Sequence, residues 1–144
     1  MKKPARAKAS KSSKKFPKKV IIPLEKAFVD VRGAIQPLVD TAIGTVQIIT
    51  SRKGTVRANH YHKTDWHYCY VVAGTIEYYH RPVGSKTKPK KVVVKAGQLF
   101  FTPSMVEHAM VFAQDTTFLN LAGNKRDQKS YETDLVRVDL VKVN

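Results

Sequence analysis

Three of the five histidines of this chain gather between residues 57 and 79, in the stretch RANHYHKTDWHYCYVVAGTIEYY. Side chains two residues apart on a β-strand project from the same face, so His60 and His62 lie side by side if this stretch is extended. Imidazole nitrogens are common ligands of transition metals. The spacing therefore allows His60 and His62 to share a metal ion.

The sequence that must position these histidines has the hydrophobic pattern of an all-β protein. From residue 20 onward, short apolar runs of period two are interrupted by Gly, Pro and polar clusters at intervals too brief for helices. One helical turn is expected within residues 124–132. The expected strands are residues 20–24, 27–31, 45–51, 56–62, 67–73, 75–81, 91–95, 98–102, 108–113, 117–122 and 135–143.

The length of 144 residues suits one domain, which we expect to span residues 20–144. About ten short strands in so small a domain must pair their edges, which favours a closed barrel or a two-sheet jelly roll. Barrels of this size can enclose a small ligand.

The net charge of +15 is concentrated at the N-terminus. Residues 1–19 contain nine Lys or Arg and no acidic residue, so we expect a disordered basic arm. Such an arm could tether the chain to nucleic acid or anionic lipid. Because it offers only Phe16 for stacking on bases, we favour the interpretation of a solubilising tail.

The single cysteine, Cys69, excludes an intramolecular disulfide and is typical of a reducing compartment. The sequence contains neither the apolar run of a signal peptide nor a membrane-spanning stretch. We therefore expect a cytoplasmic protein without a membrane partner.

Two stretches, residues 54–74 and 97–112, resemble the paired motifs of the cupin superfamily, G-x5-H-x-H-x4-E-x6-G and G-x5-P-x-G-x2-H-x3-N. The sequence departs from these motifs where His67 replaces the glutamate, Met105 the second glycine of the second motif, and Phe112 its asparagine. Four-histidine sites are known within the superfamily. The resemblance implies a single cupin jelly-roll barrel with metal ligands His60, His62, His67 and His108.

A site of this kind would hold a divalent transition metal, and imidazole suits Zn, Fe, Ni, Cu and, less strongly, Mn. Four neutral imidazoles leave the +2 charge of the ion in place, whereas a glutamate would reduce it. We therefore expect the site to favour an anionic small-molecule substrate or bound hydroxide.

The stretches FVDVRGAI, residues 28–35, and VRANHYHKT, residues 56–64, resemble segments of cupin-class nucleotide-sugar epimerases and ketoisomerases. The second stretch is also similar to metal-binding cupin domains of capsular-polysaccharide enzymes. The resemblance implies proton transfer next to the keto group of a nucleotide-linked sugar. Arg57 and Arg32 would then bind the diphosphate, because guanidinium groups pair well with phosphate oxygens.

The resemblance leaves two possible functions for His60. A histidine bound to metal has no lone pair free, so another group would move the proton, whereas in a metal-free site His60 is the expected base. We assign His60 and Tyr70 to the catalytic set. The wider set of proton-transfer candidates is Tyr61, Tyr70, Tyr79 and Glu77.

Two other functions use the same barrel. Iron or copper at these histidines would support a small metal-dependent dioxygenase, and a barrel with an occupied pocket but no turnover would be a ligand-binding protein.

Tyr68 and Tyr70 share the strand face opposite to His67 and Cys69, and this apolar area predicts a homodimer.

Overall fold

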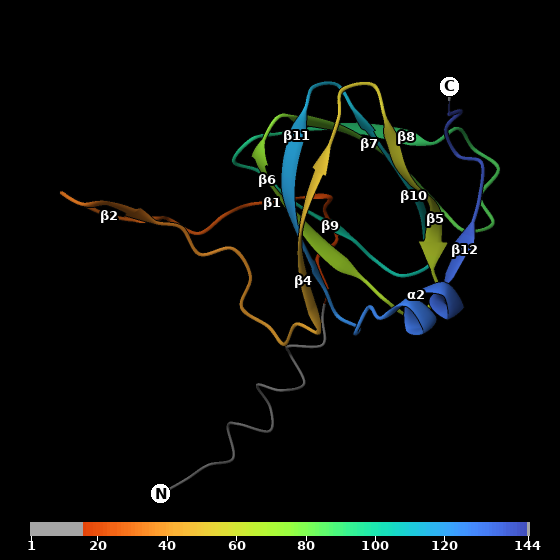
Figure 1. Cartoon of the computed structure of the whole chain (residues 1–144), viewed down its shortest axis with the longest axis horizontal. Coiled ribbons are helices and arrows are strands. Elements are labelled where there is room, and N and C mark those ends of the chain that lie inside the picture. The colour runs from red at the N-terminus through yellow and green to blue at the C-terminus, as the bar shows by residue number, and fades with distance from the viewer. Residues whose placement is uncertain (1–15, 144) are drawn as a thin grey trace, which may run out of the picture.

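The computed structural model describes residues 16–143 and shows a barrel formed by two five-stranded antiparallel sheets (Figure 1). One sheet has the strand order β1-β9-β6-β11-β4 and the other β12-β5-β10-β7-β8, while β2 and β3 form a separate hairpin. The elements are β1 (Ile21–Ile22), β2 (Phe28–Asp30), β3 (Gly33–Ile35), β4 (Thr45–Ser51), β5 (Val56–His62), β6 (His67–Ala73), β7 (Thr75–Pro82), β8 (Lys90–Lys95), β9 (Leu99–Thr102), β10 (Val106–Phe112), β11 (Thr116–Ala122), α2 (Gln128–Asp134) and β12 (Leu135–Arg137).

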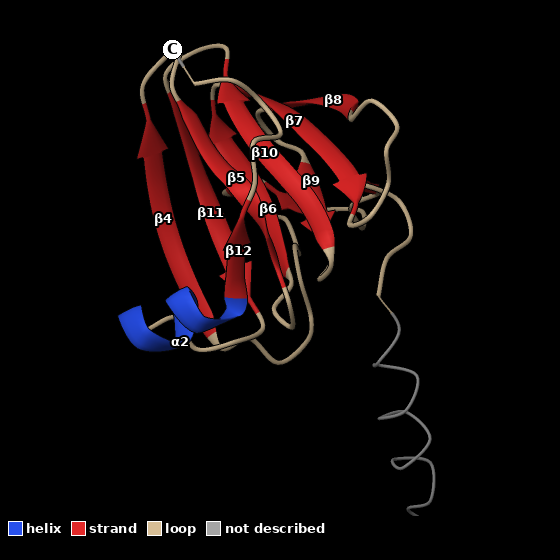
Figure 2. Ribbon diagram, turned by 90° about the vertical axis from the view of Figure 1, so that its right-hand side faces the viewer, coloured by secondary structure: helices blue, strands red, loops and turns tan. Residues whose placement is uncertain are grey.

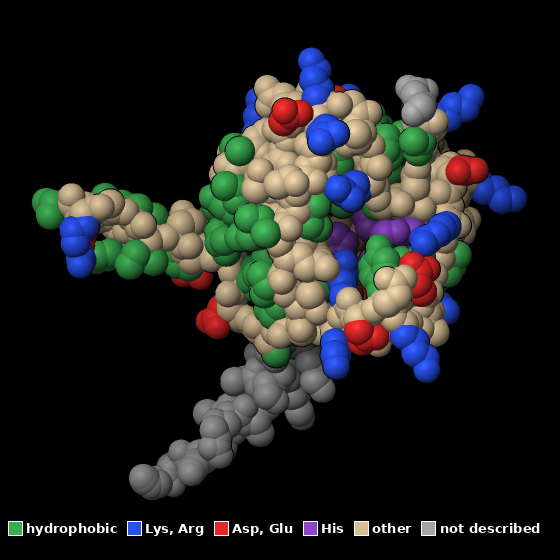
Figure 3. Space-filling view, viewed as in Figure 1, with side chains coloured by type: hydrophobic (Ala, Val, Ile, Leu, Met, Phe, Trp, Pro, Cys, Tyr) green, Lys and Arg blue, Asp and Glu red, His purple; other side chains and the backbone are tan. Residues whose placement is uncertain are grey.

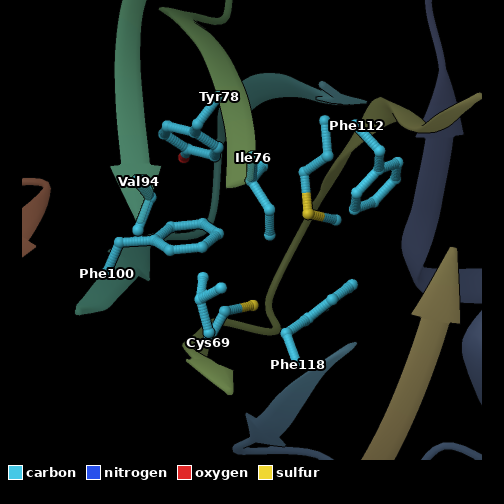
Figure 4. Packing of buried hydrophobic residues seen from close by; sticks show 9 residues of the cluster. Cys69, Ile76, Tyr78, Val94, Phe100, Phe112 and Phe118 are labelled. Atoms are coloured by element: carbon cyan, nitrogen blue, oxygen red, sulfur yellow. The ribbon is translucent and has the colours of Figure 1, made fainter. Parts of the chain in front are cut away.

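The apolar core fills the end of the barrel away from α2 and derives from strand alternation. In β11, for example, Phe118 and Ala122 are fully buried, and their neighbours along the strand are only partly buried. Figure 4 shows Phe118, Phe112 and Ile76 meeting between the sheets. This packed end leaves the other half of the barrel free for polar side chains.

The structure confirms the expected all-β, two-sheet jelly-roll barrel. Most strand bounds agree with the expectation within two residues, and two differences are larger. Residues 33–35 form a strand that the sequence did not indicate, because GAI is too short to show a period. The last strand ends at Arg137 rather than at residue 143. The period-two pattern of the sequence continues beyond Arg137, but that segment does not pair with another strand.

The helical turn expected within residues 124–132 is found slightly later, as α2. Asp127 caps the helix, accepting a hydrogen bond from the backbone N–H of Ser130 at 3.0 Å. Figure 2 shows α2 at one end of the barrel, directly before β12. The helix therefore lies over the open end of the space between the sheets.

Most of the expected basic arm, residues 1–15, lies outside the described residues. Phe16 is described, and its ring packs on Trp66 and Phe101 at centroid distances of 5.1 and 5.6 Å. Phe16 is the only aromatic residue of the expected arm, so the one ring that could stack on a nucleic-acid base packs on the barrel instead.

Within residues 16–143, no helix is long and apolar enough to cross a membrane.

Candidate active site

A pocket of about 320 Å³ opens between the two sheets at the end covered by α2. Histidine side chains are visible at the bottom of a hollow in Figure 3. The lining combines three histidines with two arginines and one tyrosine, besides apolar and amide side chains: Gln47, Ile49, Arg57, Ala58, His60, His67, His108, Met110, Phe118, Asn120, Arg126, Gln128 and Tyr131.

All four histidines at the motif positions converge. His60 and His62 project from one face of β5, and His108 on β10 is the direct cross-strand partner of His60. His67 begins β6 in the facing sheet. The ring centroids are 4.8 Å apart for His60 and His62, 4.9 Å for His60 and His108, and 5.3 Å for His67 and His108.

Hydrogen bonds fix the orientation of two of these rings. The Nδ1 atom of His62 lies 3.1 Å from Oδ2 of Asp134, and Nδ1 of His108 lies 3.0 Å from the carbonyl oxygen of Val106. Each Nδ1–H therefore donates and Nε2 keeps a lone pair, which in His62 lies 3.4 Å from Nη2 of Arg126. The Nε2 atom of His108 is buried and has no hydrogen-bond partner among the described residues.

This arrangement fits a metal ion. One ring nitrogen from each of His60, His62 and His108 lies within 4.8 Å of the other two. Metal–nitrogen bonds of about 2.0–2.1 Å need only small side-chain shifts from there. A buried nitrogen without a partner is costly unless it binds something, so His108 is a natural ligand.

His67 lies beside this group of three without being part of it. Its Nδ1 atom is 3.3 Å from the Sγ atom of Cys69, which in turn lies 3.5 Å from Oδ1 of Asn120. Asn120 donates from Nδ2 to Oε1 of Gln47 at 3.0 Å. This chain of contacts holds the imidazole of His67 in the pocket wall, next to the possible metal position.

Arg126 is the largest feature of the site that the sequence did not indicate. Its Nε atom donates to Oδ2 of Asp65 at 2.9 Å, and its Nη2 atom lies 3.4 Å from Nε2 of His62. The guanidinium also lies over the ring of Tyr131, 5.5 Å from the centroid. Arg126 thus places a nearly buried positive charge beside the histidines, which suits an anionic ligand.

Tyr131 on α2 also faces the histidines. Its ring centroid is 6.3 Å from that of His60 and 6.0 Å from that of His62. Burial raises the pKa of the Tyr131 phenol, and the nearby charge of Arg126 partly opposes this shift. Tyr131 was inside the segment expected to contain a helical turn, but no periodic pattern indicated that its side chain would face the site.

The other expected proton-transfer residues point away from the pocket. Tyr61 lies between two inward-facing histidines on β5, and Tyr70 follows the inward-facing Cys69 on β6, so both face outward. Tyr79 follows the buried Tyr78, and Glu77 pairs with Lys91 at 3.7 Å. The expectation of a catalytic Tyr70 is therefore corrected by strand alternation.

The two expected diphosphate-binding arginines differ in position. Arg57 lines the pocket, where its Nε atom donates to Oγ of Ser51 at 2.7 Å and its Nη2 atom to the carbonyl oxygen of Thr50 at 3.0 Å. Arg32 lies at the tip of the β2–β3 hairpin, with 81% of its side chain exposed and Asp30 as its ion-pair partner. Arg32 therefore does not reach the pocket of its own chain.

The backbone is left-handed at non-glycine residues close to the histidines in sequence. Ala58, two residues before His60, has φ 72°, and Met105, which replaces the second glycine of the second motif, has φ 59°. Such backbone angles cost a non-glycine residue about 1–3 kcal/mol. At Met105 the chain thus keeps a conformation that the glycine of the motif would adopt without strain.

Burial keeps the histidines of the site neutral. It lowers the pKa of His60 from 6.5 to about 2 and that of His108 to about 3, with a smaller contribution from the neighbouring imidazoles and Arg126. Burial also lowers the pKa of His67 and His62, although Asp65 and Asp134 oppose the shift at His62. Neutral imidazoles are the form that binds metal.

We expect the metal-free protein to lose stability on mild acidification. Below pH 6.5 an unfolded chain binds protons at His60 and His108, whereas the folded chain keeps both neutral to a much lower pH. Stability therefore falls with pH, by about 2 kcal/mol for each of the two residues between pH 7 and pH 5. Urea unfolding at both pH values measures this loss, and His60→Ala should reduce it by about 2 kcal/mol. Equal stability of the wild type at the two pH values would contradict the assigned neutrality.

The sequence from residue 47 to residue 121 matches the family model of the cupin domain. The match covers just over half of the chain, and the chain therefore belongs to the cupin family. A search of curated proteins finds no match.

Solved structures with the same fold include several proteins of sugar metabolism. A sugar 3,4-ketoisomerase from Thermoanaerobacterium thermosaccharolyticum, in complex with TDP, has 21% identity and a TM-score of 0.64, over 79% of this chain and 84% of that one. The dTDP-4-dehydrorhamnose 3,5-epimerase from Sulfolobus tokodaii has 20% identity and a TM-score of 0.62, over 74% and 71%. The capsular polysaccharide assembling protein CapF from Staphylococcus aureus has 21% identity and a TM-score of 0.60, over 81% of this chain and 34% of that one.

Proposed function

We propose that this protein is a metal-binding cupin enzyme that isomerises or epimerises a nucleotide-linked keto-sugar. The observation that carries the proposal is a buried cluster of neutral imidazoles directly beside the guanidinium of Arg126 and the phenol of Tyr131. The similar sugar ketoisomerase and epimerase structures support this substrate class.

His60, His62 and His108 would hold the divalent metal, with His67 as the adjacent fourth donor. A bound metal of this kind polarises a carbonyl oxygen and so acidifies the neighbouring C–H group. Asp134 orients His62 and the carbonyl of Val106 orients His108, so Nε2 is the atom of each ring that would bind the metal. These two contacts preorganise the site without adding negative charge to the immediate ligand set.

Binding of the anionic substrate is assigned to Arg126 and Arg57. Arg126 lies 3.4 Å from Nε2 of His62, so a bound metal and this guanidinium would repel each other unless an anion lay between them. A second depression of about 610 Å³ adjoins the pocket at Arg57 and is lined by Ser51, Thr50 and Arg52. It offers room and hydroxyl groups for the nucleotide.

Proton transfer is assigned to Tyr131. The phenolate form of Tyr131 would take the proton from the C–H group next to the keto group, and the phenol so formed would return a proton to the enolate at the neighbouring carbon. Arg126 over its ring favours the phenolate that must form when the proton moves. If purified protein contains no metal, His60 instead has its lone pair free and is the base.

Thermal unfolding with nucleotide diphosphates tests the proposed ligand class. Saturating TDP is expected to raise the melting temperature, because a ligand that binds only the folded state stabilises it. Arg57→Gln should diminish the shift, whereas Arg137→Gln, at an exposed arginine outside both pockets, should leave it unchanged.

If no nucleotide shifts the melting temperature and iron-loaded protein instead consumes O₂ with an organic substrate, the oxidative alternative replaces this proposal. Binding without turnover would favour a ligand-binding barrel.

The expected homodimer is part of the proposal. Tyr68 and Tyr70 lie half-buried on the outer face of β6, whereas His67 on the inner face of the same strand lines the pocket. Their position supports association through this outer face.

A further inference from the structure

Arg126 lies at the ring nitrogen through which His62 would bind a metal. The ionised carboxylate of Asp134 can only accept a hydrogen bond, so Nδ1 of His62 carries the proton and Nε2 carries the lone pair. The Nη2 atom of Arg126 is 3.4 Å from this Nε2 atom, and a guanidinium has only donors. Arg126 therefore donates to the one lone pair of His62 that a metal could use.

The base of the Arg126 side chain is fixed in this position. Its Nε atom donates at 2.9 Å to Asp65, and the two side chains are only 10% and 3% exposed. Asp65 in turn accepts hydrogen bonds from the backbone N–H groups of Trp66 at 2.9 Å and Asn124 at 2.8 Å. The buried ion pair thus anchors the guanidinium at Nε and leaves only its terminal N–H groups free to change partner.

The guanidinium has a second place to bind. Arg126 lines the pocket of about 320 Å³ together with His60 and His108, and it also lines a neighbouring hollow of about 390 Å³ that contains His62. Figure 3 shows Lys or Arg side chains bordering the histidines in the hollow of the barrel. Because Arg126 lies in the wall between the two cavities, its terminal N–H groups can exchange His62 for a ligand in the larger pocket.

The charges of the site favour such an exchange when a metal and an anion bind together. In the empty site, Asp65 balances Arg126. A divalent ion at the histidines adds two positive charges in a poorly solvated space, where repulsion is stronger than in water. An anion in the larger pocket compensates this charge and offers acceptor atoms to the terminal N–H groups of Arg126.

We infer that Arg126 couples metal binding to anion binding. In the empty site it donates to Nε2 of His62 and weakens metal binding there, and when an anion enters the pocket it turns to the anion and frees Nε2. Linkage requires that a bound metal strengthen anion binding by the same factor. The inference rests on the metal site of the proposed function, but not on the reaction.

Titration with Zn²⁺ in the absence of nucleotide tests the competition at His62. The double variant Arg126→Met/Asp65→Asn removes both members of the ion pair, so it keeps the net charge and leaves no unpaired carboxylate. An asparagine at position 65 can still accept from the backbone N–H groups of Trp66 and Asn124, and circular dichroism checks the fold. The double variant should bind Zn²⁺ at least about 10-fold more tightly than the wild type, because no charge-assisted hydrogen bond must be broken.

The outcomes of the Zn²⁺ titration separate this inference from the proposed function. If both proteins bind Zn²⁺ with equal affinity, the metal site stands and the inference is overturned. If neither protein binds Zn²⁺, the metal site of the proposed function is wrong and the inference is overturned with it.

Titration with TDP tests the coupling in the wild type itself. TDP should bind the Zn²⁺-loaded protein at least about 10-fold more tightly than the metal-free protein, because Arg126 no longer donates to His62. In the double variant this ratio should be smaller, since only the direct attraction between TDP and the metal remains. Arg57→Gln is the matched control: Arg57 lines the pocket but donates to Ser51 and Thr50, so the variant should bind TDP more weakly in both forms and keep the ratio. Equal ratios in the wild type and the double variant would show that Arg126 does not carry the coupling.

Discussion

Replacing His60 and His62 together by alanine is expected to reduce the bound metal from about one ion per chain to nearly none. These residues supply two of the three nitrogens that lie within 4.8 Å of one another, and a single remaining imidazole of that group cannot hold a divalent ion. Elemental analysis of the purified protein measures the loss. The apolar core lies at the other end of the barrel, so the double variant should remain folded.

The fifth histidine provides the control for this experiment. His80 lies on β7, with its ring stacked on Tyr78 at 5.3 Å, and it does not line the pocket. His80→Ala should therefore retain the full metal content. A double variant that binds as much metal as the wild type would show that the histidine cluster is not the metal site.

Replacing Arg126 by methionine is expected to affect both substrate binding and stability. A charge-assisted hydrogen bond to an anion contributes about 1.5–3 kcal/mol, so the affinity for a nucleotide diphosphate should fall about 10-fold to 100-fold. The change also leaves Asp65 unpaired, with only 3% of its side chain exposed. Breaking one partner of a buried ion pair costs about 3–5 kcal/mol, which urea unfolding measures.

Arg137→Met separates these effects from a general loss of positive charge. Arg137 is the last residue of β12, and its side chain is 64% exposed and pairs with Glu132 on the surface. Its replacement should change stability and nucleotide affinity only slightly. Titration calorimetry well below the melting temperature measures the affinity of the folded protein. An unchanged affinity of Arg126→Met would remove this arginine from the binding site.

The histidine positions could be predicted from the sequence because each rests on a local rule. The single residue between His60 and His62 places them on one strand face, and the motif spacing relates His67 and His108 to that strand. The same alternation also showed that Tyr68 and Tyr70 face away from Cys69. For the same reason, Tyr70 lies outside the pocket.

Arg126 and Tyr131 could not be predicted in the same way. They follow the last long strand, in a segment where no hydrophobic period fixes the direction of side chains. Their position in the site depends on tertiary contacts, such as the ion pair of Arg126 with Asp65 and the hydrogen bond of Asp134 with His62. These contacts join residues about sixty or more positions apart in the chain, and no local pattern encodes them.

Solvent exchange into a keto-sugar tests the central claim most directly. The protein is incubated in D₂O with TDP-4-keto-6-deoxyglucose, the ligand of one similar ketoisomerase structure, and the sugar is followed by proton NMR. Proton transfer next to the keto group predicts loss of the signal of the adjacent C–H as deuterium enters, together with a new sugar isomer, and Tyr131→Phe should abolish both. A sugar that binds, as shown by a thermal shift, but keeps all its C–H signals with metal-loaded and metal-free protein alike would contradict the proposed isomerase.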